Sequence, residues 1–84
     1  MDVKVASQKT LALALAAAKT YDESMCGLMS HARLSHLKYM DERIQAGVHV
    51  QGEKAHRWLG WMQACVYLAG AATHDQLQQI NREA

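Results

Sequence analysis

The sequence of 84 residues contains no proline, no phenylalanine and only five glycines. Without proline, and with Ala, Leu, Gln, Met, Lys and Glu dominating the composition, helix is favoured along most of the chain. A chain this short, half of it hydrophobic, can build only a thin core, so its apolar surface must be covered by short elements or by a second copy. The composition predicts an all-α protein with one helical domain over residues 1–84.

The sequence also lacks an excess of charge, since nine Lys and Arg face eight Asp and Glu and the formal net charge is +1. This balance gives no broad attraction to nucleic acid or to an acidic membrane, so binding to either would need a local patch. We therefore do not expect nucleic acid as a partner.

Long hydrophobic runs are missing as well, because the apolar run 11–18 is far shorter than the ~20 residues that span a bilayer. Lys4 and Lys9 give the segment a weak likeness to a secretion signal, but Asp2 and the short run argue against one. We expect no membrane segment and a cytoplasmic location.

Metal-binding spacings such as His-x-x-x-His and Cys-x-x-Cys are absent. His31 and His36 would lie about 140° apart around a continuous helix, too far to share an ion from one face. Cys26 and Cys65 would lie about two turns out of register if their helices pack as an antiparallel hairpin, so we expect two reduced, buried thiols. We predict no metal and no cofactor.

Residues that could carry catalysis do not come together in the sequence. The carboxylates form no cluster, so a general acid and base pair is not available. Residues 47–54 superficially resemble a phosphate-binding loop, but Lys54 comes one position late and Ala55 supplies no hydroxyl. Cys65 sits in an apolar stripe, where a thiol is not activated. We predict no catalytic residue and a protein that binds rather than an enzyme.

Hydrophobic periodicity predicts a helix over about 21–46, which opens at a capping box from Thr20 to Glu23 and ends at Gly47. A longer helix with no break near Thr20 remains an alternative. The apolar face of this helix would consist of Met25, Leu28, Met29, Ala32, His36, Tyr39 and Met40.

A second amphipathic helix is predicted over about 53–69, followed by Gly70 and by a second capping box from Thr73 to Gln76 that opens a short final helix. Its apolar face would consist of Ala55, Trp58, Leu59, Met62, Cys65, Val66 and Ala69. The short loop before it favours an antiparallel hairpin in which facing residue numbers sum to about 99. The first helix, apolar on every side over 11–18, must lie between surfaces.

The helix over 53–69 has a second seam, made of Arg57, Gly60, Trp61, Ala64 and Leu68. The first helix could cover this seam within the chain. Alternatively the seam is a protein interface, because Trp and Arg are enriched at binding hot spots and small residues let another backbone approach. We take these five as the partner-binding residues, and a symmetric dimer would bury them together with the run 11–18.

Residues 53–82 resemble a group of small, uncharacterised accessory proteins of tailed phages. The residues that carry the resemblance are Glu53, Lys54, Arg57, Trp58, Leu59, Gly60, Trp61, Gln63, Thr73, Leu77, Asn81 and Arg82. Members of the group often have Gly after the Gln, where this chain has Ala64. The resemblance implies a phage protein made inside a bacterium, which would act by binding a host enzyme or defence complex.

Two alternative functions remain. One is a regulatory or replication factor that touches nucleic acid, with residues 74–83 as a recognition helix after a turn over 70–73. The other is an oligomeric sponge for a small nucleotide signal, with contacts from His56, Arg57 and Tyr67.

Overall fold

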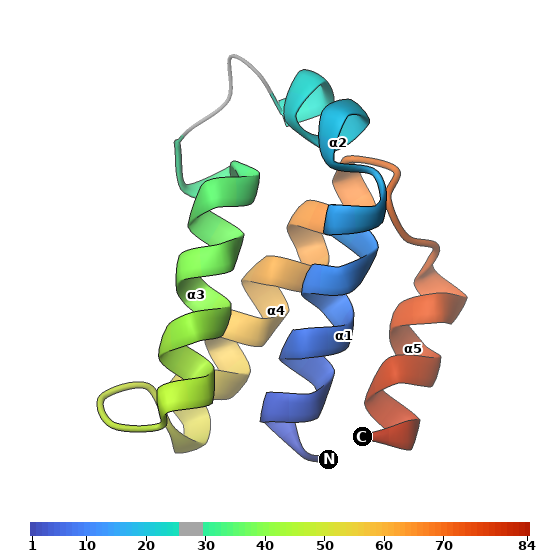
Figure 1. The fold of residues 1–84 in the computed structure, drawn as a ribbon. Helices are drawn as coiled ribbons and strands as arrows, with labels where there is room; N and C mark the ends of the chain where they lie inside the picture. Colours follow the sequence, from blue (N-terminus) through green and yellow to red (C-terminus); the bar gives the residue numbers. More distant parts are fainter. Residues whose placement is uncertain (26–29) are drawn as a thin grey trace.

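The computed structural model describes residues 1–25 and 30–84, with the side chains of residues 1–24 and 31–84. Within these residues the chain is helical and contains no strand, which confirms the all-α prediction (Figure 1). The helices are α1 (Val3–Ala16), α2 (Ala18–Met25), the 3-10 turn η1 (Ser30–Ala32), α3 (Leu34–Ala46), α4 (Gly52–Leu68) and α5 (His74–Glu83). None of them is long and apolar enough to cross a membrane.

The first helix occupies the middle of the fold. In Figure 1, α1 lies between α3 and α5 with α4 behind it, and it packs against all three. Its fully buried residues are all small: Ala6, Ser7, Thr10 and Ala14. Small side chains let the neighbouring helices approach the α1 backbone closely. The prediction that the first helix lies between surfaces is confirmed, although the helix already begins at Val3, where Asp2 caps it.

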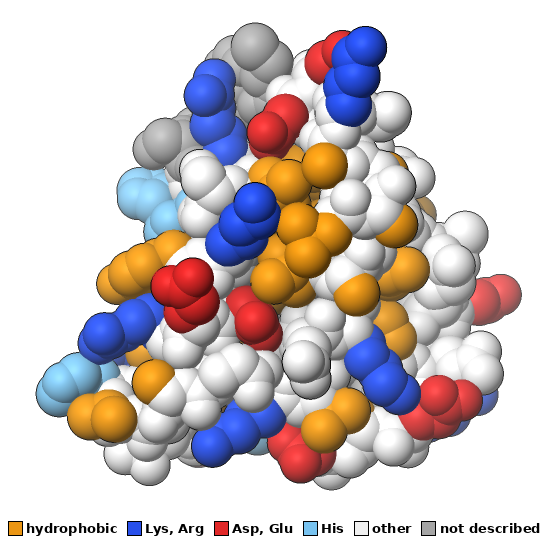
Figure 2. Space-filling model, viewed as in Figure 1, with side chains coloured by type: hydrophobic (Ala, Val, Ile, Leu, Met, Phe, Trp, Pro, Cys, Tyr) orange, Lys and Arg blue, Asp and Glu red, His pale blue; other side chains and the backbone are white. Residues whose placement is uncertain are grey.

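The face of α1 opposite its neighbours is only partly covered. Figure 2 shows hydrophobic side chains gathered over α1 between α3 and α5, with charged side chains around them. On α1, Leu15 is 44% exposed.

The predicted continuous helix over 21–46 is wrong, because α2 ends at Met25 and α3 begins only at Leu34. Two side chains of α2 hold the start of α3: the Tyr21 hydroxyl donates to the carbonyl of Ala32 (2.6 Å), and an Asp22 carboxylate oxygen accepts from the Leu34 N–H (3.1 Å). Asp22 thus caps α3 from another helix, since the N-cap residue makes no side-chain bond.

The start predicted for this helix is wrong too. Thr20 lies inside α2, which begins at Ala18, so no capping box opens there. The alternative of one long helix is also wrong, because the backbone leaves helical geometry at Ala17 (φ −124°, ψ 35°) between α1 and α2.

The apolar face predicted for this region is displaced. Ala32 and Met40 are buried as predicted, but α3 also buries Leu34, Leu37 and Ile44. His36 is only partly buried and Tyr39 is 48% exposed. The predicted face was counted from Met25 at 100° per residue. This count no longer gives the correct side of the helix once the helix is interrupted. The side chain of Met25 and the residues Cys26, Leu28 and Met29 lie outside the described part.

The second half of the chain, from Gly47 onward, agrees closely with the sequence prediction. Every residue predicted for the apolar face of α4 is buried except Trp58, which is half-buried. Gly47 ends α3 in the left-handed conformation (φ 63°), as predicted. The capping box of α5 is present, with Gln76 N–H donating to Thr73 Oγ1 (3.1 Å) and Thr73 N–H donating to Gln76 Oε1 (2.8 Å).

Candidate functional site

The five residues predicted to bind a partner form an exposed ridge along α4, which we call the α4 ridge: Arg57, Gly60, Trp61, Ala64 and Leu68. Leu68 is 74% exposed and Trp61 37% exposed. A Cβ built on Gly60 would meet no atom within 4 Å. The buried residues of α4 lie on its opposite face, so within this chain α1 does not cover the ridge. Whether a partner covers it stays a prediction.

Trp61 links the ridge to the turn before α3. Its indole N–H donates to the carbonyl of His31 (3.0 Å), so one edge of the ring is fixed while part of the ring stays exposed. This bond joins η1 to the outer side of α4. Trp61 therefore has a structural contact in addition to its exposed surface.

Toward its carboxyl end the ridge borders two open hollows between α4 and α5. Ala64 and Leu68 each line one of them, and Tyr67 and His74 line both. The sequence suggested Tyr67 only as a nucleotide contact, yet its side chain is 52% exposed beside these hollows. The hollows extend the ridge with an uneven surface that a partner could follow.

A pair of side-chain amides fixes α5 against α4. Gln63 Nε2 donates to Asn81 Oδ1 (2.8 Å), and Asn81 Nδ2 donates back to Gln63 Oε1 (3.2 Å). Gln63 also donates to Thr10 Oγ1 of α1 (3.3 Å). The two paired amides join α4 to α5, and the bond to Thr10 joins α1 to them, so three helices are held in a defined arrangement.

Sequence reasoning missed a second exposed feature, the aromatic row, which consists of His31, His36, Tyr39 and Trp58. The ring centroids are 4.8 Å apart for His31 and His36, 5.7 Å for His36 and Tyr39, and 6.3 Å for Tyr39 and Trp58. Lys54 Nζ lies 5.7 Å from the centroid of Trp58, within cation–π range. In the sequence, only the helical positions of His36, Tyr39 and Trp58 indicated that these rings could lie together. Assigning all three to apolar faces hid this indication.

The two histidines contradict the separation that we expected. Their rings form an edge-to-face pair, because His31 belongs to η1 and not to the helix that carries His36. Burial, and then the nearby His31, lower the pKa of His36 below its ordinary value. The geometric argument against a shared ion therefore does not hold. Within the described residues, however, no three His, Cys, Asp or Glu side chains are grouped as metal ligands.

Cys65 is a free and buried cysteine, as predicted. Burial raises its pKa, so the thiol stays protonated and poorly nucleophilic. The other thiol, Cys26, lies outside the described residues, so the expected register of the two cysteines is not tested.

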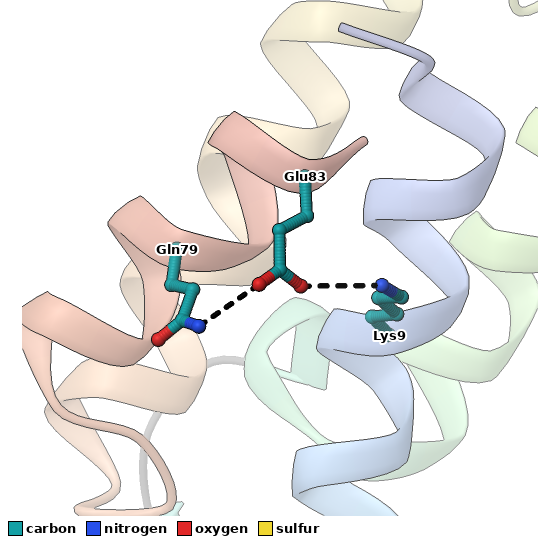
Figure 3. Close-up of polar contacts among 3 residues, drawn as sticks. All are labelled: Lys9, Gln79 and Glu83. Carbon is teal, nitrogen blue, oxygen red and sulfur yellow. Dashed lines mark hydrogen bonds and ion pairs between the residues drawn. The ribbon is translucent and has the colours of Figure 1, made fainter.

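The polar side chains of α5 make contacts within the chain. Figure 3 shows Gln79 donating to Glu83 Oε1 (2.9 Å) and Lys9 of α1 paired with Glu83 Oε2 (3.8 Å). Gln76 serves the capping box and Asn81 bonds Gln63. Few side chains of α5 therefore stay available to read bases, which weakens the alternative of a recognition helix.

The proposed nucleotide contacts are also spread out. His56 and Tyr67 are eleven residues apart on α4, about 16 Å along the helix axis. His56 Nδ1 lies 2.9 Å from the carbonyl of Gly52. The two hollows that Tyr67 lines do not include His56.

No protein-family model matches this sequence, and no curated protein or solved structure matches it either.

Proposed function

We propose that this chain is a non-catalytic accessory protein of a phage that acts in the bacterial cytoplasm. In this proposal the α4 ridge binds a host protein or defence complex and inhibits or modulates it. The observation that carries the proposal is the ridge itself, five residues of one helix that stay at the surface although the opposite face of the helix is buried.

The chemistry of the ridge suits a protein partner. Trp61 and Arg57 are the two side-chain types most enriched at binding hot spots, and Leu68 adds exposed apolar surface. Between them Gly60 and Ala64 present almost no side chain, so the backbone of another helix can approach α4 closely. Few buried polar groups would need a new partner on binding.

Six of the residues that carry the phage resemblance fall into two contrasting sets. Gln63, Thr73, Leu77 and Asn81 hold α5 on the rest of the fold by amide pairing, capping and burial. Arg57 and Gly60 do nothing comparable for the fold, since both are exposed and Gly60 has open space around it. A binding role for the ridge would account for this second set.

We also propose that α3 and α4 pack as the antiparallel hairpin expected from the sequence. The contact between Tyr39 and Trp58, whose numbers sum to 97, supports it. The helices α3 and α4 touch each other less extensively than each touches α1, so α1 supplies much of the core between them.

Capture from bacterial lysate tests the main proposal. Tagged parent protein should retain a host protein in stoichiometric amount, identified by mass spectrometry, and Leu68→Asp should lose it because it places a charge on the apolar ridge. Ala64→Arg should lose it as well, whereas Ala46→Arg, at an exposed alanine of α3, is the matched control and should retain it. Recovery of the same proteins with all variants would show that the ridge is not the binding surface.

Self-association through the same ridge, as a symmetric dimer, is a further part of the proposal, because Gly60 and Ala64 would let two copies of α4 cross closely. Light scattering after size exclusion at several concentrations should give a dimer mass for the parent and for Ala46→Arg, and a monomer mass for Ala64→Arg. A parent protein that is monomeric at every concentration would contradict self-association and leave the ridge to a host protein.

A further inference from the structure

The aromatic residues of this chain lie largely outside its core. Of the two Trp and three Tyr, only Tyr21 is buried. Aliphatic residues fill the remaining core, among them Leu37, Ile44 and Met62. Large aromatic rings stabilise a fold most when they are buried, so folding alone does not explain why the other four stay wholly or partly at the surface.

The aromatic row collects two of these four together with two histidines. Its members come from η1, α3 and α4, and each ring contacts the next. On α3 the row continues to Arg43, which lies four residues after Tyr39 on the same side of the helix. From His36 to Arg43 this surface extends about 10 Å, at a rise of 1.5 Å per residue. That length matches two or three stacked nucleotides at about 3.4 Å each.

Positive charge gathers at the Trp58 end of the row. Lys54 lies over the Trp58 ring, Arg43 follows Tyr39, and Arg57 is the exposed residue before Trp58. Two acidic residues flank these cations, because helical periodicity places Glu42 about 60° from Tyr39 and Glu53 about 40° from Arg57, so part of the positive charge is offset. In the part of the chain that the structure describes, none of the three cations forms an ion pair.

We propose that the aromatic row, with Arg43, Lys54 and Arg57, binds a short segment of single-stranded nucleic acid of two or three nucleotides. Bases stack on the exposed rings, and the phosphates lie near the three cations. Rings beside cations are how proteins hold single strands without reading their sequence, because every base has a π face and every nucleotide a negative charge. Because the chain as a whole is nearly neutral, it can bind nucleic acid only through a local patch, and we propose that this surface is that patch.

The proposed site meets the α4 ridge where Trp61 donates to the carbonyl of His31, but otherwise it occupies a different side of α4. It lies on the side of α4 that faces α3, whereas Ala64 and Leu68 border the hollows beside α5. Arg57 alone belongs to both surfaces, so variants at Tyr39 and Lys54 test the strand site without altering the ridge.

Titration of the full-length protein with an octamer of deoxythymidine, followed by tryptophan fluorescence, tests the proposal. We expect quenching as bases stack near Trp58, and equal behaviour with an octamer of uridine. Three neutralised phosphates predict a slope of about −2 for log affinity against log salt concentration. Tyr39→Ala should weaken binding about 5-fold or more, since it removes one stacking surface, and Tyr39→Trp should restore it.

The chain offers a matched control for each change. Tyr67 is exposed to nearly the same degree as Tyr39 (52% against 48%) but lies outside the row, so Tyr67→Ala should leave the affinity unchanged. Lys54→Gln should reduce both the affinity and the salt slope, by about 0.7 for one phosphate. Lys19→Gln, at an exposed lysine of α2, should change neither.

Several results would overturn the proposal. Absence of binding to either octamer is one, and an equal loss of affinity in Tyr39→Ala and Tyr67→Ala is another. Thymidine monophosphate that binds as tightly as the octamer would make the row a site for free nucleotides rather than strands. Loss of a captured host protein in Tyr39→Ala, without any binding to the octamers, would make it part of a protein interface. Circular dichroism of each variant establishes that the fold is retained.

Discussion

Tyr21 is the largest fully buried side chain of the protein, and its hydroxyl has to find a partner inside the core. It donates to the carbonyl of Ala32, across the interval between α2 and α3. Burial, and then the neighbouring Cys65, raise the pKa of Tyr21 well above its ordinary value, so the hydroxyl stays a donor. One side chain thereby fills the core and fixes the position of the chain where it enters α3.

Replacing Tyr21 by Phe removes this hydrogen bond while keeping the ring. We expect a loss of about 1 to 3 kcal/mol in the free energy of unfolding, because the Ala32 carbonyl loses its partner in a buried position. Tyr67→Phe, which removes an exposed hydroxyl, should leave the free energy nearly unchanged. Urea unfolding of both variants measures the difference, and equal values would show that the Tyr21 bond contributes nothing.

His36 should make stability depend on pH in the mildly acidic range. Its folded-state pKa is lowered, first by burial and then by His31, below the unfolded value of about 6.5. As pH falls through 6.5 the unfolded chain takes up the proton first, so stability decreases until the folded-state pKa is passed. Urea unfolding between pH 7.5 and 5 should show this loss reduced in His36→Gln. The exposed His49, changed to Gln, should retain the full dependence.

At the scale of helices, the accuracy of each sequence prediction depends on how the start of that helix is fixed. The helices α4 and α5 have unbroken periodicity, and the signal that opens α5 lies within four residues, from Thr73 to Gln76. Both were placed correctly for this reason. The start of α3 is fixed instead by Asp22, twelve residues earlier and in another helix, and no local pattern contains that bond.

The candidate sites follow the same division. The α4 ridge was predicted because its five residues share one face of one well-predicted helix. The aromatic row escaped prediction because it joins three segments across the misplaced start of α3, so that His31 and His36 were assigned to one helix. A surface built within one element can be found from periodicity, whereas a surface built across elements needs the fold.

The capping box gives a prediction at this scale. Thr73→Ala should lower the free energy of unfolding by about 1 kcal/mol, since the Gln76 N–H loses its acceptor at the start of α5. Thr20→Ala, in the interior of α2, removes no cap and should cost much less. Thermal unfolding of the two variants beside the parent decides the comparison. An equal loss for both would show that the bonds at Thr73 are not stabilising.

At the scale of the whole molecule, the narrow buried face of α1 sets the distances between helices. Ser7 lies where α3 and α4 meet α1, with its Oγ donating to Asp41 (2.8 Å) and lying 3.5 Å from Met62 Sδ. The backbone N–H of Asp2 donates to the carbonyl of Ala84 (2.7 Å), so α1 and α5 are joined there. The packing of α3, α4 and α5 therefore depends on contact with one helix.

Enlarging the buried face of α1 should separate these helices. Ala14→Leu adds volume at a position with no exposure, and we expect it to lower the free energy of unfolding by about 1 to 3 kcal/mol. Ala12→Leu, at an exposed position of the same helix, should be tolerated. Chemical denaturation of both variants tests this. An Ala14→Leu protein as stable as the parent would mean that the core has unfilled volume beside Ala14.

During synthesis α1 leaves the ribosome before every helix that covers it. Its buried face has no partner until α3 and then α4 have emerged, and a helix of this length is only marginally stable on its own in water. The apolar run 11–18 is therefore accessible to chaperones on the nascent chain. Folding of these helices therefore waits until α4 has emerged, and a ribosome that stalls before α4 is complete leaves a product for proteases.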